Sequence, residues 1–178
     1  MKSKIISISA ISAGFVALFL CVGSYLSIVE IFSTVVASAF VILPLYYKSY
    51  KGCFLAYLVG GAISLLVCIP SILYSFVIPA YFVFFGIYPI IKNIFIDKNI
   101  NKYLSFVVGL IWCVATIYGV FFYYTLIMGL QINGLPYFIS KNVLIFLAPV
   151  GILFFLIYDR FVVVCKYAID KYLNRIIK

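Results

Sequence analysis

The stretch MKSKIISISAISAGFVALFLCVGSYLSIVE, residues 1–30, indicates the fold class of this chain. Two lysines, Lys2 and Lys4, precede an apolar run over residues 5–25, and Glu30 follows it. An α-helix needs about 20 apolar residues to cross the hydrocarbon core of a bilayer. The run is longer than the apolar region of a signal peptide and has no small-residue cleavage site after it, so we interpret it as a retained first membrane helix.

The same pattern continues through all 178 residues. Hydrophobic residues make up 67% of the chain and charged residues only 10%, with a mean hydropathy of +1.29, which excludes an ordinary soluble domain. Charges and prolines divide the chain into six candidate spans, at residues 5–25, 31–47, 52–69, 72–91, 103–130 and from 143 past 158. The predicted fold is therefore all-α: a polytopic membrane protein whose six transmembrane helices form one domain over residues 1–178.

The basic residues predict the orientation in the membrane. Twelve of the 13 Lys and Arg residues lie at the N-terminus, in the second and fourth gaps, or in the C-terminal tail: Lys2, Lys4, Lys48, Lys51, Lys92, Lys98, Lys102, Arg160, Lys166, Lys171, Arg175 and Lys178. Basic residues beside spans stay cytoplasmic. Six spans with both termini in the cytoplasm satisfy every gap, so we predict a multi-pass protein of a bacterial cell membrane. The net charge of +9 is then a basic rim facing membrane lipid, and no nucleic-acid partner is predicted.

The C-terminal tail, residues 159–178, predicts an amphipathic helix. Charged and amide residues recur there at near-helical spacing, with apolar residues such as Val164 and Ala168 between them. We expect this segment to continue the sixth helix along the inner membrane surface.

Small residues at four-residue spacing predict close helix contacts. Ala10, Ala13, Gly14 and Ala17 form such pairs in the first span, and Gly52, Ala56, Gly60 and Ser64 form a stripe in the third. Small residues let helix backbones approach closely in lipid. Two interpretations remain open, packing inside the bundle and docking of a separate membrane subunit through Ala13 and Ala17. Pro44, Pro79 and Pro89 add kinks that either open a cavity or only bend their helices.

Polar residues on the predicted outer side are the candidate ligand-binding residues, because polar groups buried in a membrane without partners are costly. Glu30 is the one acidic residue predicted on that side. The six candidates, drawn from all three outer gaps, are Glu30, Ser27, Tyr74, Tyr123, Gln131 and Asn133. They would line a pocket opening outward. The alternative is that these residues form a solvated belt at the membrane–water interface, where Tyr is commonly found.

Residue types that carry catalysis or bind metals are scarce. The chain has no histidine, its five cysteines form no CxxC pair, and its four acids are well separated. No metal site, cofactor, catalytic residue or phosphate-binding GxxxxGK[ST] loop is predicted, and an enzyme is not expected.

The layout resembles the substrate-binding S component of energy-coupling factor (ECF) transporters. The stretch Ala13-Gly-Phe-Val-Ala17 matches the AxxxA motif of that family's first helix, residues 27–67 resemble its second and third helices, and Tyr158-Asp159-Arg160 resembles the end of many members. The resemblance implies a subunit that binds a vitamin-like solute from outside and depends on a separate transmembrane coupling subunit and ATPases. Family members often have a longer first outer loop than this chain. The alternative function is a non-transport membrane scaffold similar to the MreD family of morphogenesis proteins.

Overall fold

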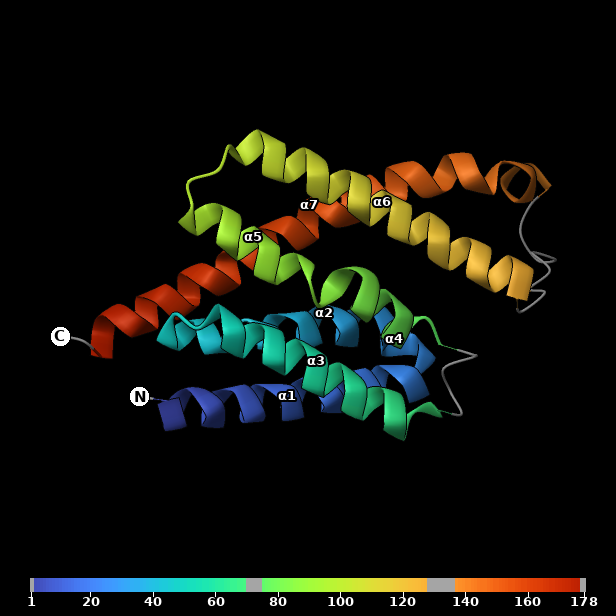
Figure 1. Ribbon diagram of the computed structural model, residues 1–178. Helices are drawn as coiled ribbons and strands as arrows, with labels where there is room; N and C mark the ends of the chain where they lie inside the picture. The colour runs from blue at the N-terminus through green and yellow to red at the C-terminus, as the bar shows by residue number, and fades with distance from the viewer. Residues whose placement is uncertain (1, 70–74, 128–136, 177–178) are drawn as a thin grey trace.

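The computed structural model describes residues 2–69, 75–127 and 137–176, and every element in these ranges is a helix (Figure 1). In chain order the elements are α1 (Lys2–Tyr25), the 3-10 turn η1 (Ser27–Val29), α2 (Glu30–Val41), the 3-10 turn η2 (Leu43–Tyr47), α3 (Tyr50–Val67), α4 (Val77–Ala80), the π-helical turn η4 (Tyr81–Phe85), α5 (Tyr88–Asp97), α6 (Lys102–Ile127) and α7 (Tyr137–Ile176).

Six stretches of the described residues are long and apolar enough to cross a membrane. They are Ser3–Tyr25, Ser27–Tyr47, Tyr50–Val67, Val77–Asp97, Lys102–Tyr123 and Leu147–Lys171. The predicted class of an all-α, six-span, multi-pass membrane protein is therefore confirmed. Figure 1 shows both ends of the chain at one end of the bundle, together with the α5–α6 loop. The assignment of that end to the cytoplasm stays a prediction from the basic residues.

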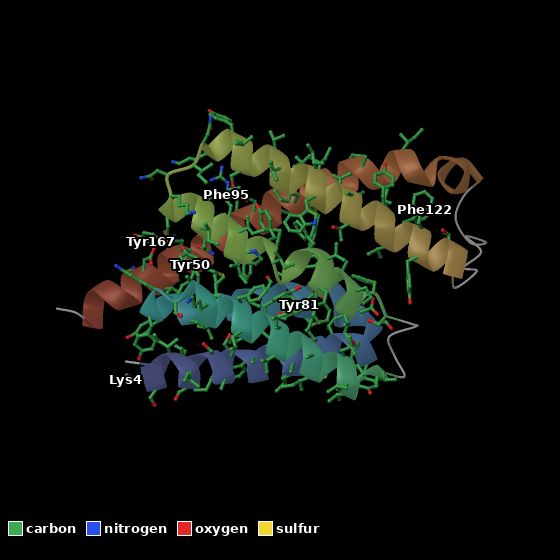
Figure 2. The ribbon with its side chains drawn as sticks, in the orientation of Figure 1. Lys4, Tyr50, Tyr81, Phe95, Phe122 and Tyr167 are labelled. Atoms are coloured by element: carbon green, nitrogen blue, oxygen red, sulfur yellow. The ribbon has the colours of Figure 1, made fainter. Side chains whose placement is uncertain are left out.

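The bundle has two groups of helices with a broken helix between them (Figure 1). α1 packs against α2 and α3, and α6 packs against α7. The segment α4–η4–α5 lies between the groups and contacts members of both. Its aromatic side chains form the centre of the core: Tyr81, Phe84 and Tyr88 are buried with Phe155 and Tyr158 of α7. Figure 2 shows Tyr81 inside the bundle.

Hydroxyl groups from neighbouring helices satisfy the carbonyls that the helix breaks release. A proline has no N–H to donate to the carbonyl four residues before it. Pro89 thus frees the Phe85 carbonyl, which accepts a hydrogen bond from the Tyr158 hydroxyl at 3.2 Å. Pro44 likewise frees the Phe40 carbonyl, which accepts from the Ser12 hydroxyl at 2.5 Å. The kinks are therefore held by contacts between helices.

The π turn is stabilised in the same way. The Gly86 N–H donates to the Tyr81 carbonyl, five residues back, instead of to the carbonyl of Phe82. The Tyr57 hydroxyl of α3 donates to the Phe82 carbonyl at 3.0 Å. An α-helix that has a π turn gains one extra residue, and the side chains beyond it are rotated around the axis. The π turn and Pro89, in the first turn of α5, together make the fourth span irregular.

One residue differs from the sequence prediction, and the end of α7 adds a detail that the sequence did not show. Lys92 was expected in the fourth gap, but α5 continues to Asp97 and Lys92 is a buried residue of that helix. α7 continues without a break to Ile176, with Pro149 inside it. Along residues 159–169 its charged face points inward, since Asp159 and Lys166 are buried while Val164 and Ala168 are exposed. The reason is that the oppositely charged partners of these residues lie on α5.

Candidate functional site

A pocket of about 420 Å³ lies between the broken fourth span and α6. It is in the half of the bundle away from the two chain ends, towards the end of α6 where Figure 2 labels Phe122. We call it the α4–α6 pocket, and its lining residues are Phe76, Pro79, Ala80, Val83, Trp112, Ala115, Thr116, Gly119, Val120 and Tyr123. Pro79 and Ala80 of the first turn of α4 and Val83 of the π turn form one wall of the pocket, and α6 forms the other.

The walls of the α4–α6 pocket are mostly apolar, with a few polar groups. The Thr116 hydroxyl donates to the Trp112 carbonyl at 2.9 Å, which leaves its oxygen able to accept a further hydrogen bond. Tyr123 and Trp112 add polar edges to aromatic surfaces. A Cβ built on Gly119 would meet no atom within 4 Å, so this glycine faces open space in the pocket wall. Such a cavity can hold a small molecule with an apolar body.

Glu30 lies near the same end of the bundle, at the first position of α2. The Ser75 hydroxyl, from the segment before α4, bonds to its carboxylate. Its backbone carbonyl accepts from the hydroxyls of Ser33 at 2.9 Å and Thr34 at 2.7 Å. The buried Ser24 hydroxyl of α1 has no partner among the described residues, and such groups need a water or a ligand. The first two outer gaps therefore meet at the contact between Glu30 and Ser75.

The predicted site residues are only partly brought together. Tyr123 shares the α4–α6 pocket with Phe76, and the preceding residue, Ser75, contacts Glu30. Ser27 is exposed on η1 and does not line the pocket. Tyr74, Gln131 and Asn133 lie outside the described residues, so their predicted roles stay predictions. Sequence reasoning missed the apolar walls from α4 and α6, although Pro79 was a signal for them.

The predicted docking residues Ala13 and Ala17 are covered by the protein's own helices. Their exposed fractions are 2% and 6%. α1 approaches α3 closely at Gly60, where an added Cβ would lie 2.8 Å from the Val16 Cβ and 3.0 Å from the Ala13 carbonyl oxygen. This geometry agrees with the internal-packing interpretation. The docking role of the pair stays a prediction, and no exposed surface of either residue supports it.

A charged network that the sequence reasoning missed joins α5 to α7 at the end that holds both termini. The Lys92 ammonium lies 2.6 Å from the Asp159 carboxylate, and both side chains are almost fully buried. The Tyr88 hydroxyl donates to the same carboxylate. Further along both helices, Asp97 pairs with Lys166.

Two hydrogen bonds extend this network. The Tyr50 hydroxyl of α3 donates to Asp97 and lies 3.2 Å from the Asn93 carbonyl oxygen, so three helices meet there. The Asn93 side chain donates to the Pro89 carbonyl at 2.7 Å, and its buried Oδ1 has no partner among the described residues. Charges inside spans are costly and are normally paired. The sequence carries one signal of this pairing. Lys92 precedes Asp97 on α5, and Asp159 precedes Lys166 on α7, so two parallel helices can pair both charges.

No family model, curated protein or solved structure matches this chain. Its function is therefore inferred from its own residues. Among the described residues, no three His, Cys, Asp or Glu side chains gather in a way that would hold a metal ion. The α4–α6 pocket is the candidate binding site, and Glu30 is linked to its Phe76 wall through Ser75. The α5–α7 network joins two helices at the opposite end of the bundle.

Proposed function

We propose that this protein is the membrane-embedded solute-binding subunit of an uptake transporter. The α4–α6 pocket is the observation that carries the proposal, because about 420 Å³ lies within the range of small-molecule sites. Its walls match the usual composition of such sites, mainly apolar and aromatic with a few polar groups. The solute is a small molecule with a ring or other apolar body, which packs beside Trp112, and a hydrogen-bonding group that reaches Thr116 or Tyr123.

Glu30 adds a negative charge at the same end of the bundle. It is half-buried and held by Ser75, next to the Phe76 wall of the pocket. A carboxylate in this position favours solutes with a cationic or hydrogen-bond-donating group. The variant Glu30→Gln keeps the size and an acceptor for Ser75 but removes the charge. We expect it to fold and to lose about 1–3 kcal/mol of solute binding. Unchanged binding would remove Glu30 from the site.

Transport would require other subunits, since the sequence lacks a phosphate-binding loop of the Walker type. The resemblance to ECF S components suggests a transmembrane coupling subunit and ATPases as partners. With Ala13 and Ala17 buried, Ala10 and Gly14 are the two members of the predicted small-residue set of α1 that are exposed and available to a partner helix. An added Cβ at Gly14 would meet no atom within 4 Å, so the surface there is open.

Two glycine variants test the proposal with opposite readouts. Gly119→Leu puts a side chain into the open space of the α4–α6 pocket, and Gly14→Leu puts the same side chain on the outer face of α1. Both proteins should fold, because neither position has a close neighbour and leucine favours helix over glycine. Small molecules retained by each purified protein in mild detergent would be identified by mass spectrometry.

We expect the wild type and Gly14→Leu to retain the same small solute, and Gly119→Leu to lose it. Copurification of ATPases and a coupling subunit should show the reverse dependence, lost with Gly14→Leu and kept with Gly119→Leu. Recovery of phospholipid alone from all three proteins would refute the solute-binding proposal. Envelope proteins without ATPases among the copurified partners would favour the scaffold alternative.

A further inference from the structure

A second pocket of about 420 Å³ lies at the other end of the bundle, where α5 turns into α6. We call it the α5–α6 pocket. Its polar walls come from Lys92, Asn99, Asn101, Lys102 and Ser105, and none of its lining residues is acidic. Phe95, another of its walls, lies at the end of the bundle that holds both termini (Figure 2).

The local structure of the turn shapes this pocket. Asn99 adopts a left-handed conformation with φ of 51°, which asparagine tolerates better than most residues. The Asn101 side chain then accepts a hydrogen bond from the Tyr103 N–H at 3.0 Å and caps α6. The turn therefore directs the start of a 26-residue helix towards the pocket. The first N–H groups and the dipole of such a helix favour an anion.

The side chains of the pocket leave positive charge and hydrogen-bonding capacity unused. The Lys102 ammonium has no ion-pair partner among the described residues, whereas Lys92 is held in place by Asp159. Ser105 is only 6% exposed, lines the pocket, and its hydroxyl has no hydrogen-bond partner in the described part of the chain. A hydroxyl without a partner on a mostly buried residue, together with an unpaired ammonium in the lining of the same pocket, is an arrangement that an anion with several acceptor oxygens would complete.

The position of the pocket identifies the source of that anion. The pocket lies where one candidate span ends at Asp97 and the next begins at Lys102, which is the depth of lipid headgroups. Its remaining walls are apolar, with Phe95, Ile96 and Ile100. Basic pockets between transmembrane helices on the cytoplasmic side bind the headgroups of anionic lipids. A phosphate carried by a lipid would place its oxygens at Lys102 and Ser105 and its glycerol and upper acyl chain along the apolar wall.

We propose that the α5–α6 pocket binds the phosphate group of an anionic phospholipid. Lys102 supplies the charge, and Ser105 with the first turn of α6 supplies hydrogen bonds. Lys92 forms the inner wall of the pocket, and its ammonium also pairs with the Asp159 carboxylate. This site is independent of the α4–α6 pocket and of any transported solute. A bound lipid would fix the α5–α6 turn against the membrane next to the α5–α7 network.

The test compares Lys102→Gln with Lys98→Gln, a matched control. Both lysines are exposed in or beside the same turn, but Lys98 does not line the pocket. Delipidated protein in detergent would be titrated with dioleoyl phosphatidylglycerol or dioleoyl phosphatidylcholine, and bound lipid counted by native mass spectrometry. We expect phosphatidylglycerol to bind preferentially and Lys102→Gln to weaken it about fivefold, which corresponds to about 1 kcal/mol for one charge. Lys98→Gln should stay within about twofold of the wild type.

A second variant and a competition experiment complete the test. Ser105→Ala should weaken phosphatidylglycerol binding about threefold or more, because the variant removes one hydrogen bond to the phosphate. Equal binding of the two lipids, or an equal loss in Lys102→Gln and Lys98→Gln, would overturn the proposal in favour of a diffuse basic rim. Displacement of phosphatidylglycerol by an equal concentration of inorganic phosphate would overturn the lipid assignment.

Discussion

The buried ion pair between Lys92 and Asp159 allows a quantitative prediction about stability. The variant Asp159→Asn keeps the shape of the side chain and an oxygen that accepts from the Tyr88 hydroxyl, but it removes the negative charge. At the observed separation of 2.6 Å, two unit charges attract each other by about 6 kcal/mol with an effective dielectric constant of about 20. In the wild type this attraction offsets the cost of removing both ions from water.

In Asp159→Asn the attraction is lost while the Lys92 ammonium remains buried. Both side chains are about one-tenth exposed, so water can compensate only partly. We expect the free energy of unfolding to fall by about 3–5 kcal/mol, the usual result of breaking a buried pair from one side. The double variant Lys92→Met with Asp159→Asn buries no net charge, so it should recover to within about 1–2 kcal/mol of the wild type.

The assay unfolds the protein with a denaturing detergent and monitors the transition by the fluorescence of Trp112, the only tryptophan of the chain. Its ring lies 5.9 Å from that of Phe84, which in turn packs against Tyr158 in the core, so its emission reports the packing of this region. The matched control is Asp170→Asn, the same substitution at an exposed position of α7, which should change stability by less than about 0.5 kcal/mol. A loss in Asp159→Asn no larger than in this control, or a double variant no more stable than the single one, would refute the reasoning.

Three further predictions concern packing and orientation. Gly60→Ala should destabilise the bundle by about 1–3 kcal/mol in the same unfolding assay, since its Cβ would crowd α1, whereas Gly14→Ala, which meets open space, should be neutral or stabilising. Tyr158→Phe should cost about 1–3 kcal/mol, because the carbonyl freed by the proline of α5 loses its donor, and full stability in this variant would contradict the proposed role of the hydroxyl. In a cysteine-free background, Ser27→Cys should react with an impermeant thiol reagent on intact cells and Asn99→Cys should not; the opposite pattern would reverse the predicted orientation.

Small residues show how far the sequence could predict packing. The spacing of Ala10, Ala13, Gly14 and Ala17 indicated that α1 makes close helix contacts, and α1 does pack closely against α3. The same spacing did not indicate which of these residues face a partner. Ala13 and Ala17 are buried in the bundle, while Ala10 and Gly14 are exposed. Lipid and protein surroundings are both apolar, so hydrophobicity does not distinguish the two faces of a membrane helix.

The candidate site, too, could be predicted from the sequence only in part. Pro79 indicated an irregular fourth span, and Tyr123 was a predicted site residue that does line the α4–α6 pocket. The apolar residues that complete this pocket have no distinguishing feature in the sequence, because aliphatic and aromatic residues occupy every span. The contact of Ser75 with Glu30 depends on how two separate outer segments meet, which no local pattern encodes.

The sequence by itself determined the class of this protein, its six spans and the expected orientation. These properties depend on the free energy of transferring each segment and its flanking charges into a membrane, which is a sum over neighbouring residues. Only the tertiary structure decided that Lys92 and Lys166 are buried residues paired with Asp159 and Asp97 rather than members of a basic rim. Such pairing joins residues about 70 positions apart and depends on which helices become neighbours, so it arises only when the bundle assembles.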